Sequence, residues 1–425
     1  MSSLAVKSIP NILNRSILDR EIYWYDNEHT HHANRDIGIL TNRWKHLLRH
    51  NGAVKGNLVT ISMFTVDMIH VSAIFACAEM GLKIIILDSP ATKESLPYTK
   101  LALHGPSDFY LHHDDNYMFA YGGLHGEMLR RYGGKSVSVE DLDDMPFEDL
   151  VTDEVYPDDP LLMSSTSGTT KPSRPVLFSH KEVMTISRRN VDIFKFDENS
   201  KVVHSRNLHH ASAMLTSLIP SLMASNHHLT FPLSHDNPIT EHRRDMGFYR
   251  RLREDEYTHI MIANKHTLMD FLETYQAPFK SKLHINMCGF ALDQSFVELA
   301  EKYNVSFHSH YGSIDTAIPL LVNFVDKDSV VKDNSLGILP DDFYRFDGKE
   351  VRCELWDEPR YIEDQLKYED GEFFIKPRKE NTGRYIMEIT RGLDIDIDLF
   401  FQDTKLNYEQ LRGHIQEVKK KYDKS

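Results

Sequence analysis

The chain has 425 residues, of which 41% are hydrophobic and 26% are charged, as is ordinary for a soluble globular protein. Its 49 Lys and Arg stand against 63 Asp and Glu, and the formal charge of -14 disfavours nonspecific binding to a nucleic-acid backbone. The chain shows no secretory signal, no apolar segment long enough to span a bilayer and only three widely separated cysteines, so we expect a cytoplasmic protein without a disulfide framework.

In the first third of the chain, short apolar runs alternate with segments of helical periodicity. We expect strands at 57–63, 83–87 and 108–113. The apolar segment 66–81, which ends on a glycine, predicts a helix between the first two strands, and 93–105 predicts another before the third. Alternation of this kind is typical of a parallel α/β sheet.

The same alternation resumes after an acidic connector at 138–159. Five further strands are predicted, at 202–205, 228–233, 258–263, 283–289 and 305–312. The clearest helix among them covers 292–304, and beyond about residue 320 Asp-Gly pairs between short β runs indicate tight turns. We therefore expect an α/β protein in four parts: a first α/β subdomain (1–150), a second (151–325), a β-rich subdomain (326–380) and a short C-terminal remnant (381–425).

The 24 histidines include adjacent pairs, which raises the question of a metal site. The pairs are His31-His32, His112-His113 and His227-His228. Neighbouring residues of a strand point to opposite faces, and most of these pairs lack a carboxylate or cysteine at a ligand spacing. We therefore interpret them as exposed residues of loops and strand ends.

Residues 164–180, SSTSGTTKPSRPVLFSH, combine many hydroxyl side chains with a single glycine. The flanking runs DDPLLM and PVLF predict strands, so the stretch forms the turn between them, and Ser179 with Glu182 then forms a capping box that opens a helix. Such a turn directs N–H and O–H donors to one point, which suits phosphate oxygens, although the spacing of a P-loop is absent. The alternative for any Ser/Thr cluster is a solvated turn.

The order of residues in this stretch strongly resembles the phosphate-binding loop of the adenylate-forming superfamily, which includes acyl-CoA synthetases, luciferases and peptide-synthetase adenylation domains. The family pattern is T-S-G-[ST]-T-G-x-P-K-G-V, often followed by Ser-His. The matching residues are Thr166, Ser167, Gly168, Thr169, Thr170, Val176, Ser179 and His180. The second glycine of the pattern is either replaced by Lys171 or deleted, and Arg174 is our candidate for the cation that binds phosphate.

Further landmarks follow in the order of the family. The strand–helix–strand stretch 55–94 resembles its early part, and SRNLHHASAML resembles the P-L-[FY]-H-x-x-[GA] segment, whose histidine borders the pocket of the carboxylate substrate. His209 and His210 both fit that position, and we favour His210 because small residues follow it. A satisfied core histidine is the alternative interpretation.

Two more landmarks lie in the stretch 285–317. Gly289, Phe290 and Ala291 resemble the G-G-A-x-L segment, whose backbone lies against adenine in the family. Tyr311, Gly312 and Ser313 begin a segment that resembles Y-G-x-T-E, in which Ile314 replaces Thr and Asp315 replaces Glu. A tyrosine ring offers a flat face for a purine, and the carboxylate of Asp315 can bind Mg²⁺. A plain Tyr-Gly turn at a strand end is the alternative.

The last landmark, YIEDQLKYEDGEFFIKPR, resembles the family segment in which a carboxylate binds both ribose hydroxyls. Asp364 takes that position and Arg378 that of the arginine near the hinge, while a solvated turn residue is the alternative for Asp364. Residues 379–425 show no Ser-Gly-Lys segment like the one that carries the catalytic lysine of the family. A lysine supplied in trans, a reduced lid or a weak enzyme all remain open.

The resemblance, which covers about residues 30–380, implies the N-terminal domain fold of adenylate-forming enzymes: two α/β layers and a small β-rich subdomain. It implies an AMP-forming acid–thiol ligase that uses ATP and Mg²⁺, with Arg174, His210 and Asp315 as catalytic residues and CoA or an acyl or peptidyl carrier protein as acceptor. Ile314, the altered loop and the missing lysine support an alternative, a nucleotide-binding module without the chemistry. An α/β enzyme that uses no nucleotide is a second alternative.

Overall fold

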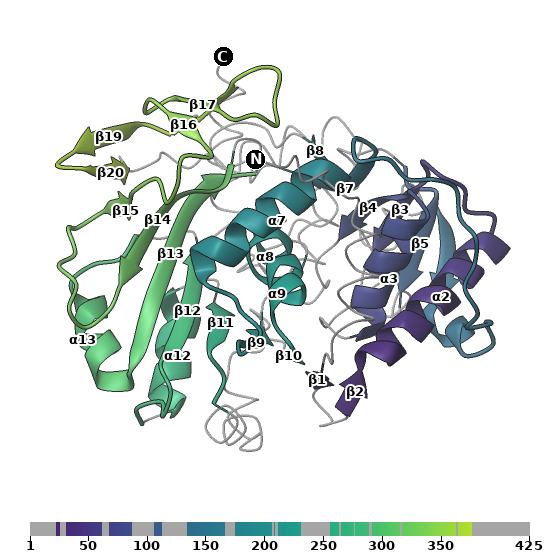
Figure 1. Ribbon diagram of the computed structural model, residues 1–425, viewed down its shortest axis with the longest axis horizontal. Coiled ribbons are helices and arrows are strands. Elements are labelled where there is room, and N and C mark those ends of the chain that lie inside the picture. Colours follow the sequence, from purple (N-terminus) through teal and green to yellow (C-terminus); the bar gives the residue numbers. More distant parts are fainter. Residues whose placement is uncertain are drawn as a thin grey trace, which may run out of the picture.

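The computed structural model describes residues 23–25, 31–61, 68–86, 106–112, 134–165, 175–205, 208, 211–230, 256–262, 265–275, 277–288, 291–314, 317–362 and 364–375. Within them lie two large, mostly parallel sheets, two small antiparallel sheets, and helices between and outside the large sheets (Figure 1).

The first sheet contains, among the described residues, six strands in the order β6-β5-β3-β4-β7-β8. Their bounds are β3 (Leu58–Ile61), β4 (Lys83–Ile86), β5 (Phe109–His112), β6 (Lys135–Ser138), β7 (Pro160–Ser165) and β8 (Pro175–Ser179). All neighbours are parallel except β7 and β8, which form an antiparallel pair at the edge. The parallel strands β3, β4 and β5 are almost wholly buried, which is why their sequences are continuous apolar runs.

The second sheet has the order β14-β13-β12-β11-β9-β10-β1-β2 within the described part of the chain. Its strands are β1 (Tyr23–Tyr25), β2 (His31–Ala33), β9 (Lys201–His204), β10 (His227–Thr230), β11 (His259–Ile262), β12 (Leu283–Cys288), β13 (Val305–Ser313) and β14 (Ala317–Val325). From β13 across the sheet to β1, each strand is parallel to its neighbour. The two edge strands are antiparallel to their neighbours, β2 to β1 and β14 to β13.

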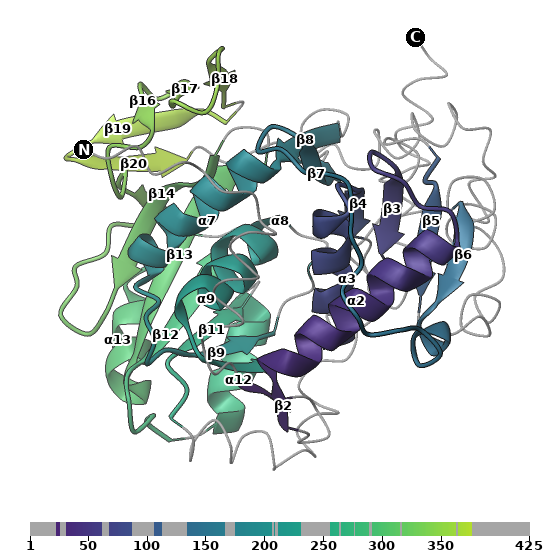
Figure 2. The same ribbon diagram turned by 45° about the vertical axis from the view of Figure 1, so that its right-hand side comes forward.

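A small β subdomain, which we define as strands β15 to β20, lies beside β14 (Figure 2). It holds two antiparallel sheets, β15-β20-β19 and β16-β17-β18. The strands are β15 (Ser335–Gly337), β16 (Arg345–Phe346), β17 (Glu350–Arg352), β18 (Arg360–Tyr361), β19 (Leu366–Glu369) and β20 (Glu372–Ile375). Asp370 and Gly371, both at positive φ, form the tight turn between β19 and β20.

Helices occupy the space between the two large sheets and cover the outer face of the second (Figures 1 and 2). The helices are α2 (Asn34–His50), α3 (Met68–Glu79), the 3₁₀-helix η1 (Val139–Leu142), α7 (His180–Phe194), α8 (Ala211–Ala213), the π-helix η2 (Met214–Leu218), α9 (Ile219–Ala224), α12 (Lys265–Tyr275) and α13 (Ser295–Tyr303). α7, η2 and α9 contact one another between the sheets, and α12 and α13 pack on the opposite side of the second sheet.

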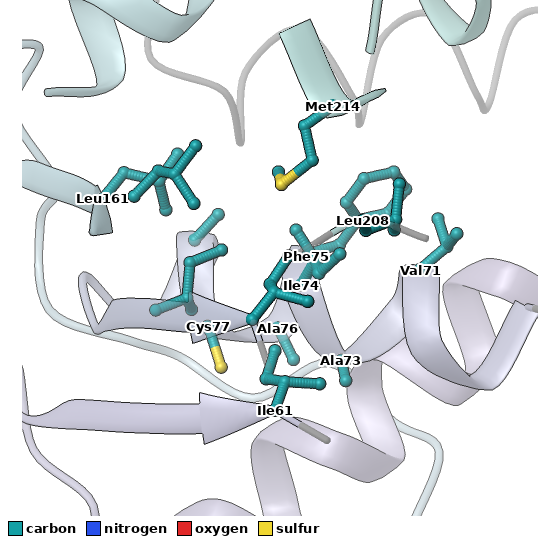
Figure 3. Close-up of a cluster of buried hydrophobic side chains, with 14 of the residues drawn as sticks. Ile61, Val71, Ala73, Ile74, Phe75, Ala76, Cys77, Leu161, Leu208 and Met214 are labelled. Carbon is teal, nitrogen blue, oxygen red and sulfur yellow. The ribbon is translucent and has the colours of Figure 1, made fainter. Parts of the chain in front are cut away.

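The largest core cluster joins the first sheet to the helices between the sheets (Figure 3). Ile61 of β3 and Leu161 of β7 meet α3, whose side chains also contact Met214 of η2. Because α3 is apolar nearly all round, it must be covered on every side, and this position provides that cover.

The structure confirms the expected fold class and most of the predicted strands. In the large sheets it adds to the prediction β1 and β2, at one edge of the second sheet, β6, whose sequence is polar, and β14, which extends the second sheet in the antiparallel direction to Val325. The first sheet takes strands from both sides of residue 150, since β7 pairs with β4 and β8 pairs with β7. The four-part domain division stays a prediction.

Candidate functional site

An antiparallel strand pair brackets the hydroxyl-rich stretch. β7 ends at Ser165 and β8 begins at Pro175, and these two residues stand opposite each other in the ladder. Residues 166–174 therefore leave and re-enter the sheet at one point, as predicted for a turn between two strands. The turn itself lies outside the described residues.

The helix that follows β8 begins with the predicted capping box. Ser179 Oγ accepts a hydrogen bond from the backbone N–H of Glu182 at 3.2 Å, and Glu182 Oε2 accepts one from the backbone N–H of Ser179 at 3.0 Å. These bonds satisfy donors that a helix start otherwise leaves free. The start of α7 is therefore defined to the residue, directly after the strand pair.

The same carboxylate also binds the small β subdomain. Glu182 Oε1 accepts hydrogen bonds from Trp356 Nε1 at 3.1 Å and from the Arg360 guanidinium at 2.8 Å, and that guanidinium lies 4.0 Å from the centre of the Trp356 ring. We call these three residues the Glu182 clasp. The clasp ties the helix after the hydroxyl-rich stretch to the subdomain that carries Asp364.

A cavity of about 430 Å³ lies beside the clasp. Asp158, two residues before β7, and Lys181, at the start of α7, are among its lining residues. These residues belong to the end of the β7–β8 pair that is remote from residues 166–174, about 15 Å away along strands of this length. The cavity therefore lies at the end of the strand pair opposite to Ser165 and Pro175.

A second attachment lies two turns further along α7. Arg189 Nε donates to Asp341 Oδ2 at 2.6 Å, and Arg189 donates a second bond to the backbone oxygen of Pro319 at 2.6 Å. The guanidinium also lies 4.6 Å from the centre of the Tyr344 ring. Because residues seven apart lie on one face of a helix, Glu182 and Arg189 present a single face of α7 to the β subdomain and β14.

Tyr311 and Asp364, which are 53 residues apart in the chain, are in direct contact. The Tyr311 hydroxyl donates a hydrogen bond to Asp364 Oδ2 at 2.6 Å. Tyr311 lies near the carboxyl end of β13, the last strand of the second sheet's parallel run, and ligands of α/β sheets bind at such ends. An aromatic ring thus lies beside a carboxylate, a combination that suits a purine and its ribose.

The residues after Tyr311 are described as far as Ile314. Gly312 is exposed and Ser313 is half-buried. Ile314 packs against the largest core cluster, as does Val176, the second residue of β8. The apolar side chain at 314, where the resembled family has threonine, therefore serves packing.

Of the other predicted site residues, Ala291 is described and is half-buried in the segment after β12. Those outside the described residues are Thr166, Ser167, Gly168, Thr169, Thr170, Lys171, Arg174, His210, Gly289, Phe290, Asp315 and Arg378. Their roles stay predictions, as do those of Tyr311, Gly312, Ser313 and Asp364. The Glu182 clasp was not predicted, and the capping box was the local signal that pointed to Glu182.

The prediction that the paired histidines are exposed is wrong for His112 and His228, which are 3% and 0% exposed. Both lie in strands of the large sheets, which are covered on both faces. The ring of His228 stacks on that of His204, and desolvation lowers the pKa of His228 to about 4.

Within the described segments, no group of three His, Cys, Asp or Glu side chains could bind a metal ion, and none of the helices there could cross a bilayer.

No family model matches the sequence, and no curated protein matches it significantly. Solved structures do match. The inhibitor-bound N-terminal domain of FACL13 from Mycobacterium tuberculosis aligns with a TM-score of 0.70 and 14% identity, over 88% of this chain and 100% of that chain. McyG A-PCP, complexed with phenylalanyl-adenylate, aligns with a TM-score of 0.70 and 16% identity over 89% and 77%. The Klebsiella oxytoca NpsA N-terminal subdomain, in complex with 3-hydroxybenzoyl-AMSN, aligns with a TM-score of 0.66 and 13% identity over 88% and 100%.

At these identities the likeness shows the fold. The chain has the fold of the N-terminal domains of adenylate-forming enzymes, with two mostly parallel sheets and small antiparallel sheets. The fold that the sequence resemblance implied is therefore confirmed.

Proposed function

We propose that this chain activates a carboxylic acid with ATP. A carboxylate oxygen attacks the α-phosphorus, a new oxygen–phosphorus bond forms, the bond between the α- and β-phosphates breaks, and pyrophosphate leaves with its electron pair. The product is an acyl-adenylate. The observation that carries the proposal is the Tyr311–Asp364 contact at the carboxyl end of β13, on a fold shared with adenylate-forming enzymes.

The residues would act by positioning and by charge. Tyr311 would stack on adenine, Asp364 would accept from the ribose hydroxyls, and the backbone at 289–291 would lie against the base. Positioning of two reactants and stabilisation of developing charge supply most of the catalysis in phosphoryl and adenylyl transfer.

The phosphate end of the nucleotide would lie at the β7–β8 turn. Ser167, Thr169, Thr170 and Arg174 would bind the β- and γ-phosphates, and His210 would border the acid. Asp315 has the chemistry to bind Mg²⁺, which neutralises the triphosphate when bound. The described position of the strand ends at Ser165 and Pro175 supports a turn at this place.

The acyl group would then pass to a thiol, either CoA or a carrier protein. Two of the similar structures contain a carrier domain, McyG A-PCP and the NpsA–ThdA fusion, and another is a fatty acyl-CoA synthetase. This second half-reaction would use a thiol partner and residues beyond Arg378.

A second candidate function is a nucleotide-binding module without the chemistry. The packing of Ile314 into the core favours it, because an isoleucine there cannot donate to a phosphate. This module would bind ATP in the same place and form no adenylate.

The test is acid-dependent exchange of pyrophosphate into ATP, across fatty, aromatic and amino acids. We expect exchange with at least one class, and loss of it in Arg174→Ala and Asp315→Ala. Lys181→Ala, a change on the far side of the β7–β8 pair, serves as the control and should retain exchange. Saturable ATP binding without exchange would establish the binding module instead, and absence of ATP binding would contradict both.

A further inference from the structure

The second sheet turns a polar face toward the helices between the sheets. Asn286 of β12 is paired in register with His308 of β13, and Cys288 with His310. Residues paired in this way point to the same face of a sheet. The alternating residues Leu283, Ile285, Met287, Val305 and Phe307 belong to the core cluster on the opposite face, with α12 and α13. We call Asn286, His308 and His310 the polar patch.

The polar atoms of this patch are buried, and several have no partner. His310 is 4% exposed, and neither of its ring nitrogens has a hydrogen-bond partner among the residues that the structure describes. In the same part of the chain, Asn286 Oδ1 and His308 Nδ1 also have none, at 1% and 4% exposure. A buried polar group without a hydrogen-bond partner destabilises the folded chain. Three adjacent residues in this condition point to a ligand that supplies the missing bonds.

Helix elements bound the patch on two sides. The ring of Phe194, the last residue of α7, lies 6.4 Å from that of His308 and 5.7 Å from that of His310. On the other side, Met261 is the register partner of Asn286 on β11, and its sulfur contacts Thr216 Oγ1 of η2 at 3.9 Å. η2 is π-helical, a widened turn that is frequent at functional sites.

The patch also adjoins the proposed nucleotide site. His310 directly precedes Tyr311, whose ring packs with the core of the small β subdomain, whereas His310 faces the helices between the sheets. Cys288, beside the patch, directly precedes 289–291. A ligand group on the patch would therefore lie next to the proposed adenylate, on the inner side of the sheet.

We propose that the acid activated by this chain carries an uncharged hydrogen-bonding group, such as a ring hydroxyl or ring amine, and that the polar patch binds this group. This inference rests on the proposed function. The patch offers an amide and two imidazoles, and no Asp, Glu, Lys or Arg belongs to it, so an uncharged hydrogen-bonding group is the complement. A plain alkyl chain would leave the polar atoms buried without partners, which is costly. A site built to bind a hydroxyl discriminates strongly against the analogue that lacks it.

The experiment compares kcat/KM for pyrophosphate exchange with benzoate, with its hydroxy- and amino-substituted isomers, and with hexanoate. For the wild-type chain, we expect at least one substituted isomer to exceed both benzoate and hexanoate by tenfold or more. Asn286→Leu and His310→Phe should reduce that preference to within threefold of unity. His310→Gln, which keeps a donor and an acceptor, should retain most of it.

His46→Phe is the matched control. His46 lies in α2, which packs on α3 and η1, and its ring bonds to the backbone oxygen of Glu148 at 3.0 Å. We expect this variant to keep the wild-type preference. Each preference is a ratio of two substrates on one preparation, so a reduced folded fraction does not change it.

The outcomes separate the two claims. Exchange by the wild type with benzoate or hexanoate at least as good as with every substituted isomer would overturn this inference and leave the proposed function standing. A preference that survives both Asn286→Leu and His310→Phe would overturn the assignment to the patch. Absence of exchange with any acid would overturn the proposed function itself. Should both variants fail to fold, the wild-type ratio alone decides.

Discussion

The Glu182 clasp leads to a quantitative prediction. Glu182→Ala removes the carboxylate that accepts hydrogen bonds from Ser179 at the start of α7 and from Trp356 and Arg360 in the small β subdomain. The change therefore affects a helix start and a contact between distant parts of the chain together. It leaves the helix propensity of position 182 at least as good, because alanine is the best helix former.

The expected loss follows from the three contacts. Loss of the capping box costs about 1 kcal/mol. The ion pair with Arg360, whose side chain is 27% exposed, contributes less than about 1 kcal/mol because solvent screens it. The Trp356 N–H, left without its acceptor, costs about 1 kcal/mol more. We expect the free energy of unfolding to fall by about 2–3 kcal/mol, and the melting temperature by about 3 °C in a chain of this size.

Thermal unfolding followed by circular dichroism measures this effect. Glu301→Ala, an exposed glutamate of α13, is the matched control and should change the melting temperature by about 1 °C or less. In Glu182→Gln, which keeps an acceptor oxygen but loses the charge, we expect an intermediate decrease. If Glu182→Ala melts within 1 °C of the control, the reasoning is refuted, because the observed hydrogen bonds would then contribute nothing to stability.

Three further predictions follow from separate features. Tyr311→Phe keeps the ring but loses the hydroxyl that orients Asp364, so we expect the KM for ATP in the exchange assay to rise about fivefold. An unchanged KM would contradict a role of this hydrogen bond in ATP binding. Gly337→Ala places a Cβ against the backbone of β14 at a φ of 86° and should cost more than about 3 kcal/mol in urea unfolding, whereas Gly348→Ala, at a φ of 100° with open space around it, should cost about 1 kcal/mol. His228 has a pKa of about 4 in the folded chain against 6.5 in the unfolded chain, so between these pH values the unfolded state binds more protons. The free energy of unfolding should therefore fall by about 3 kcal/mol as the pH is lowered from 6.5 to 4, and urea unfolding of His228→Phe should show a smaller fall over that range.

Local features of the fold could be predicted from the sequence because nearby residues determine them. The capping box of α7, the Asp-Gly turn between β19 and β20 and the buried parallel strands each follow from a short run of residues. β6 was missed because its residues, Lys135–Ser138, have no apolar run, and its place in the sheet comes from pairing with β5.

The candidate site divides in the same way. The resemblance assigned Tyr311 and Asp364 from two different motifs, and the hydrogen bond between these residues is consistent with both assignments. The partners of Glu182 could not be predicted, since Trp356 and Arg360 are 174 and 178 residues away and belong to no recognisable pattern. The burial of His228 was missed because the His227-His228 pair alone does not show which elements pack on the two faces of its strand.

The two attachments of α7 restrict how the small β subdomain can rotate. A body held at one point can pivot, but Glu182 and Arg189 hold this one at two points about 10 Å apart along the helix. Any swing of the subdomain must then break one attachment or carry α7 with it, and with α7 the strand β8 that precedes it. Motion of Asp364 and motion of β8 are therefore mechanically linked.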